Sequence, residues 1–154
     1  MTDPDSTTTI SVDQFVPHPP DRVWEAITTA EQLSRWFMPT DIRPEVGAEF
    51  TFTRPVVKPE LREGKLIHCR VLEVRVGEVL VYSWADRQFP DGLDSTVTWT
   101  LHPEGTGTRV LLVHRGFDPE DPVSQSLRDV MTEGWGRLLS QLLGNFLTDG
   151  SSRY

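Results

Sequence analysis

The sequence predicts a single α+β domain in which an antiparallel sheet is combined with two short helices and one long C-terminal helix. Three observations support this prediction. Apolar residues recur at three- and four-residue steps near both ends of the chain, they alternate with polar residues across its middle, and short turns separate the alternating runs. The 154 residues suit one ordinary domain, and five Trp and seven Phe suffice for a sizeable core.

The N-terminal part is predicted to form one strand and two helices. The strand covers Ile10–Val16, and the prolines of Pro17–Pro20 end it and open the first helix. Thr29 and Gln32 fit a capping box, in which Thr29 accepts from a free backbone N–H and Gln32 reaches back. The second helix is therefore expected from Ala30 to about Phe37.

The middle of the chain is predicted to form five consecutive strands. Short turns join them, which indicates an antiparallel meander. The longest strand is expected from about Gly64 to Val74, and the segment Arg54–Glu60 before it is expected to be a loop at the pocket mouth. Alternation places the following residues on the inward face: Phe50, Phe52, Leu80, Tyr82, Trp84, Val97, Trp99, Leu101, Val110, Leu112 and His114.

The C-terminal part is predicted to be one helix of about 25 residues, on the order of 37 Å long. Asp121 is a suitable N-cap with Pro122 in the first turn, and the apolar stripe continues to Asp149. Three glycines interrupt this helix, each at a cost of roughly 1 kcal/mol relative to alanine. They indicate a close backbone approach, a bend, or room for something else. The glycines are Gly134, Gly136 and Gly144.

Composition argues against several classes of function. With 23 acidic and 15 basic residues the net charge is −8, so we expect no binding to nucleic acid or membrane. A polar N-terminus and the absence of long apolar runs predict a soluble, cytoplasmic protein. One cysteine and four scattered histidines predict no metal and no cofactor. Residues 1–8 are expected to be disordered, 9–149 to form the domain, and 150–154 to form a tail.

Several segments in a fixed order resemble one known family. They are Pro20–Trp24, Leu33–Phe37, Val71–Val74, Leu80–Trp84, Ser95–Leu101, His114–Phe117 and Gly134–Trp135. Together they are similar to the family named after the activator of the heat-shock-protein-90 ATPase, within the START-like (SRPBCC, Bet v-like) superfamily. The resemblance runs from about Ile10 to Leu147. It implies a helix-grip fold, in which a curved six-stranded sheet wraps around the long helix and encloses a hydrophobic cavity.

Ten residues are candidates for the wall of this cavity. They are Trp36, Phe52, His68, Tyr82, Trp84, Trp99, His114, Phe117, Trp135 and Leu139. Aromatic side chains on a concave sheet can line a ligand pocket, but they can equally fill it, since burying one Trp contributes roughly 4 to 6 kcal/mol. Trp24, on the first helix, is expected in the core.

Two histidines among these candidates have alternative interpretations. A buried His114 could orient a ligand or transfer a proton, or it could be a core histidine satisfied by a tyrosine, backbone or water partner. His68 shares a face of its strand with Leu66 and Leu72, which would let it reach the cavity.

The leading functional hypothesis is a non-enzymatic domain that binds a small hydrophobic or amphipathic molecule. One alternative is a co-chaperone-like modulator of a heat-shock-protein-90 ATPase. The other is a cavity enzyme in which His114, with Tyr82 as its partner, transfers a proton. No catalytic residue is assigned. The protein is expected to be a monomer or a weak homodimer that pairs through the edge of its first strand.

Overall fold

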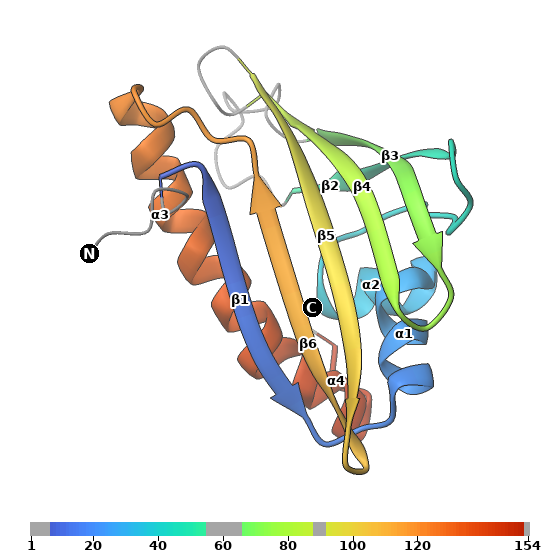
Figure 1. Ribbon diagram of the computed structural model, residues 1–154. Coiled ribbons are helices and arrows are strands. Elements are labelled where there is room, and N and C mark those ends of the chain that lie inside the picture. The colour runs from blue at the N-terminus through green and yellow to red at the C-terminus, as the bar shows by residue number, and fades with distance from the viewer. Residues whose placement is uncertain (1–6, 55–65, 88–91, 153–154) are drawn as a thin grey trace.

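The computed structural model describes residues 7–54, 66–87 and 92–152 (Figure 1). Their elements follow the predicted order of one strand, two helices, five strands and a long helix. They are β1 (Thr9–Val16), α1 (Pro20–Thr28), α2 (Ala30–Trp36), β2 (Glu49–Thr53), β3 (Leu66–Arg75), β4 (Val79–Asp86), β5 (Leu93–Glu104), β6 (Gly107–Arg115), α3 (Pro122–Arg137), the π-helix η2 (Leu138–Leu142) and α4 (Leu143–Asp149). Predictions for residues 1–6 and for loop residues 55–60 lie outside the described ranges.

The strands form one antiparallel sheet in the order β1-β6-β5-β4-β3-β2. All helices lie on one face of it, with the long helix running beside β1 and β6 (Figure 1). The short helices α1 and α2 pack against α4, the end of the long helix. The core therefore lies between the sheet and the helices. None of the helices in the described ranges combines the length and the hydrophobicity that a membrane-spanning segment requires.

The inward faces of β2, β4, β5 and β6 are as predicted, but the alternation on β3 is the opposite of the expected one. Ile67 and Cys69 are buried, whereas His68 is exposed on the outer face. Pairing with β2 explains this, because Ile67 lies opposite Phe52 and residues opposite one another point to the same side of the sheet. The strand carries apolar residues on both faces, so its own pattern does not specify which face is buried.

The long helix begins as predicted and contains one irregularity. The Asp121 carboxylate accepts a hydrogen bond from the Val123 backbone N–H at 3.0 Å. Midway along, η2 makes the wider π-type turn, with the Leu143 N–H donating to the Leu138 carbonyl. Leu138 and Leu139 of this turn are buried against the sheet side. The helix is therefore continuous from α3 to α4, but its hydrogen-bond pattern changes at its centre.

The predicted capping box at α2 is wrong. The Thr29 side chain makes no capping hydrogen bond, although the helix does begin at Ala30, with the Leu33 N–H donating to the Thr29 carbonyl. The Gln32 side chain instead accepts from the Arg22 guanidinium at 2.8 Å and donates to Glu25. Contacts with the neighbouring helix α1 therefore replace the local cap.

Substitution of Gly134 or Gly144 by alanine should each raise the free energy of unfolding by about 0.5–1 kcal/mol. A Cβ atom at either position would meet no atom within 4 Å, so alanine fits and helix propensity decides the outcome. The matched control is Gly150→Ala, which should lower stability because Gly150 ends the helix at a φ of 74°. Urea denaturation measures the free energy of unfolding of all three variants. A change in the same direction for Gly144→Ala and Gly150→Ala would contradict this explanation.

Candidate functional site

An aromatic cluster occupies the space between the sheet and the helices. It consists of Trp36, Phe37, Phe50, Phe52, Tyr82, Trp84, Trp99, His114, Phe117 and Trp135. The centroids of contacting rings lie between 4.9 Å (Phe37 and Phe52) and 6.4 Å (Trp36 and Trp99). Except for His68, every predicted wall residue belongs to this cluster or, like Leu139, is buried with it.

In the described part of the chain, the cluster rings pack against one another and have almost no accessible surface. Trp36 and Phe52 have 0 % of their surface accessible and Trp135 has 3 %. Because accessible surface includes the walls of internal cavities, values this low mean that other atoms cover the rings. These aromatic side chains therefore fill the interior in this conformation.

Trp135 lies at the centre of the aromatic cluster and is the cluster residue that the long helix provides. Its ring centroid is 5.3 Å from that of Phe37, 5.7 Å from that of Trp84 and 5.9 Å from that of Trp99. Trp84 and Trp99 are fixed on the paired strands β4 and β5. The indole of Trp135 thus joins the helix to the sheet.

A line of buried hydrogen bonds crosses the aromatic cluster through His114. The Trp135 indole N–H donates to His114 Nδ1 at 3.1 Å, and His114 Nε2 lies 2.8 Å from Ser95 Oγ. Since an indole can only donate, Nδ1 is the acceptor and the neutral ring carries its proton on Nε2. Nε2 therefore donates to Ser95, whose hydroxyl donates to the Trp84 carbonyl at 2.9 Å.

His114 is a core histidine with 0 % of its surface accessible. Burial lowers the pKa of His114 to about 3, because the charged ring would lose its hydration. Both ring nitrogens already have partners. Tyr82, its expected partner, instead accepts from the Trp99 indole N–H at 3.1 Å, and burial raises the pKa of Tyr82. The arrangement thus favours orientation and packing over acid–base chemistry near neutral pH.

The depressed pKa of His114 predicts a loss of stability on acidification. Unfolded histidine takes up a proton near pH 6.5, whereas folded His114 does so near pH 3, so between these values the unfolded state binds the extra proton. The free energy of unfolding should fall by up to about 1.4 kcal/mol per pH unit below 6.5 through this residue. Urea denaturation between pH 4 and pH 7 should show a shallower dependence for His114→Gln than for the unsubstituted protein. Exposed His102→Gln is the control, and equal slopes in all three proteins would contradict the prediction.

A buried ion pair lies at the same end of the sheet as His114. The Asp86 side chain is 0 % exposed and its Oδ2 is 2.5 Å from Arg54 Nη2, while the Trp84 indole N–H donates to the same oxygen at 3.3 Å. Sequence analysis did not assign this pair. The alternation in the sequence could have indicated the pair. Arg54 continues the inward row of Phe50 and Phe52, and Asp86 continues the inward row of Tyr82 and Trp84.

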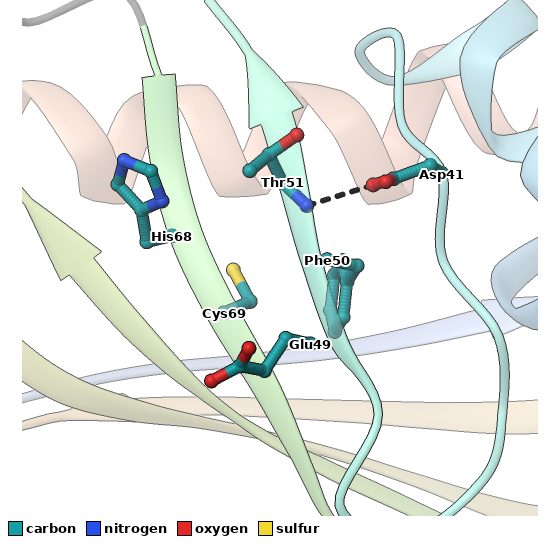
Figure 2. Close-up of a pocket in the computed structure, with 6 residues that line it drawn as sticks. All are labelled: Asp41, Glu49, Phe50, Thr51, His68 and Cys69. Atoms are coloured by element: carbon teal, nitrogen blue, oxygen red, sulfur yellow. Dashed lines mark hydrogen bonds between the residues drawn. The ribbon is translucent and has the colours of Figure 1, made fainter.

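His68 lies outside the interior and lines a shallow surface pocket at the β2–β3 edge (Figure 2). The pocket has a volume of about 300 Å³ and is lined by Asp41, Glu49, Phe50, Thr51, His68 and Cys69. Asp41 accepts a hydrogen bond from the Thr51 backbone N–H at 2.9 Å. Burial raises the pKa of the Cys69 thiol, which disfavours the reactive thiolate. Among the described residues, no three metal-ligating side chains gather at one point.

A curved antiparallel sheet that packs one face on a long C-terminal helix defines a START-like (SRPBCC) domain of the helix-grip type. The sequence profile of the Activator of Hsp90 ATPase homolog 1-like protein family matches residues 17–146, so the chain belongs to that family. This confirms the resemblance found in the sequence.

Solved structures support the same assignment. Protein MLL2253 from Mesorhizobium loti is 30% identical with a TM-score of 0.78, over 92% of this chain and 98% of that one. CalU16 from Micromonospora echinospora is 25% identical with a TM-score of 0.70, over 92% and 76% of the two chains. The Aha1 dimer from Colwellia psychrerythraea, 14% identical with a TM-score of 0.69 over 92% and 97%, shows the fold alone. No curated protein matches the chain.

Proposed function

We propose that this domain binds a small hydrophobic or amphipathic molecule between the sheet and the long helix, without converting it chemically. The observation that supports this is the line of polar groups through the aromatic cluster, from Trp135 through His114 to Ser95. Rings offer contact to an apolar ligand, and the polar groups can orient it. The proposed binding residues are Trp36, Phe52, Tyr82, Trp84, Trp99, His114, Phe117, Trp135 and Leu139.

Binding in a filled interior requires that the interior opens. Strands β4, β5 and β6 are paired without a register shift, whereas the long helix has a π-type turn at Leu138–Leu142 and glycines on either side of that turn. π-type turns often occur at functional sites. We therefore expect the long helix to move relative to the sheet when a ligand enters, so that the binding site forms during binding.

Tryptophan fluorescence tests the proposal directly, because four of the five indoles lie in the aromatic cluster. Purified protein is titrated with myristate, a sterol, an aromatic polyketide and benzoic acid. At least one should change the emission saturably, and Trp24→Phe should preserve the change because Trp24 lies on α1 outside the cluster. If no compound produces a saturable change, the proposed function is wrong.

The chaperone alternative remains a prediction from the sequence. If this protein modulates a bacterial heat-shock-protein-90 ATPase, its addition should change the turnover of that ATPase. Unchanged turnover would remove the alternative while leaving the proposed ligand binding intact.

A further inference from the structure

We infer that the ligand is an uncharged planar aromatic molecule with an N–H or O–H donor, which replaces the Trp135 indole and donates to His114 Nδ1. This inference rests on the proposed function and specifies the chemistry of the ligand. It follows from what holds Trp135 in place and from what its departure would leave behind.

Trp135 is the cluster residue that lies on the long helix between two glycines. Gly134 and Gly136 flank it, and the π-type turn begins shortly afterwards at Leu138. A Cβ atom at either glycine would meet no atom within 4 Å, so close packing explains neither glycine. A glycine on each side of Trp135 instead lowers the free-energy cost of changing the backbone conformation around the indole. The rings opposite, by contrast, are held by the paired strands β4 and β5.

Withdrawal of the Trp135 indole would leave a flat apolar slot with one unpaired polar atom. The slot walls would be the rings of Phe37, Trp84 and Trp99, all now within 6 Å of the Trp135 centroid. His114 would keep its bond to Ser95 through Nε2, but Nδ1 would lose its donor. A buried acceptor without a donor is costly, so the slot selects ligands that supply one.

The same slot disfavours charged ligands. An ionised group among aromatic rings would lose its hydration without gaining a counter-ion. His114 stays neutral because Nδ1 accepts a hydrogen bond and Nε2 donates one, so the ring provides no charge to pair with an anion. An indole or phenol group satisfies both requirements of shape and hydrogen bonding.

Indole and benzofuran separate the effect of the hydrogen-bond donor from the effect of ring shape. The two compounds have nearly the same shape, but indole has an N–H where benzofuran has an oxygen. Titrations followed by ¹H–¹⁵N spectra should show indole binding about tenfold more tightly, as expected when an unpaired buried polar group is avoided. The Trp135 indole N–H signal, assigned with Trp135→Phe, should move on addition of indole. The Trp24 signal is the internal control and should not move.

Trp135→Phe provides a second test that keeps a ring on the helix. It removes the N–H that competes for His114 Nδ1, so indole should bind this variant several-fold more tightly than the unsubstituted protein. Benzofuran should also bind this variant several-fold more tightly, because its binding no longer breaks the hydrogen bond between Trp135 and His114. The preference for indole over benzofuran should therefore stay at about tenfold. Trp24→Phe should change neither affinity.

The possible failures are distinguishable. Equal affinities for indole and benzofuran, or an unmoved Trp135 signal with indole bound, would overturn the inference. Saturable binding of myristate or a sterol, with no binding of either bicyclic compound, would overturn it while the proposed function stands. If no compound binds at all, both are wrong.

Discussion

Replacement of Asp86 by alanine is expected to lower the free energy of unfolding by about 3–5 kcal/mol. The Asp86 carboxylate is completely buried and is the partner of both the Arg54 guanidinium and the Trp84 indole N–H. Its removal takes the carboxylate away from the Arg54 guanidinium, whose side chain is only 22 % exposed, and takes the acceptor away from the buried Trp84 N–H. Urea denaturation at neutral pH measures the loss.

The matched control is the ion pair between Glu49 and Arg70, which has the same 2.5 Å separation but lies in solvent, with 72% and 56% of the two side chains exposed. Solvent screening makes such pairs weak, so Glu49→Ala should cost clearly less than Asp86→Ala. Burial, rather than distance, thus accounts for the difference between the two pairs. Equal losses for Asp86→Ala and Glu49→Ala would show that the buried pair does not stabilise the end of the sheet.

Replacement of Trp135 by alanine is also expected to cost about 3–5 kcal/mol. The substitution removes the ring that joins the helix to the sheet, and it deprives His114 Nδ1 of its hydrogen-bond donor. Thermal and urea denaturation measure the change. Trp24→Ala removes an indole of the same size from a half-buried position on α1, and it should cost clearly less.

The Trp135→Ala variant also tests whether the vacated space accepts a ligand. Addition of indole should restore part of the lost stability, because a ligand that binds only the folded state raises the free energy of unfolding. Benzofuran should restore less, since it cannot donate to His114. A variant that loses no more stability than Trp24→Ala would contradict the central place of Trp135 in the aromatic cluster.

Local patterns in the chain were sufficient for most of the fold. The alternation in β2, β4, β5 and β6 identifies which residues are buried, because every second side chain points to the same face of the sheet. Asp121 and Pro122 begin the long helix as expected. The order of segments also identified the family. The alternation and the helix start depend on residues that are close together in the sequence, whereas the family resemblance depends on the order of segments along nearly the whole chain.

Contacts between different elements decided two features that the local sequence pattern could not predict. Strand β3 carries apolar residues on both faces, and its pairing with β2 turns Cys69 inward and His68 outward. Similarly, the Thr29 cap was replaced because Gln32 is bound by Arg22 of the preceding helix. In β3 the local pattern was ambiguous, and at Thr29 a weak local preference was overridden; in both cases contacts with another element decided the outcome.

The chemical state of the interior also depends on contacts between residues far apart in the chain. Trp135 on the long helix, His114 on β6 and Ser95 on β5 meet only after folding, and their hydrogen bonds give His114 its neutral tautomer. The alternation of residues places an aromatic side chain on the concave face but cannot tell whether it lines a space or fills one. That depends on how closely the helix approaches the sheet, and here the helix approaches closely enough for the indole of Trp135 to fill the space.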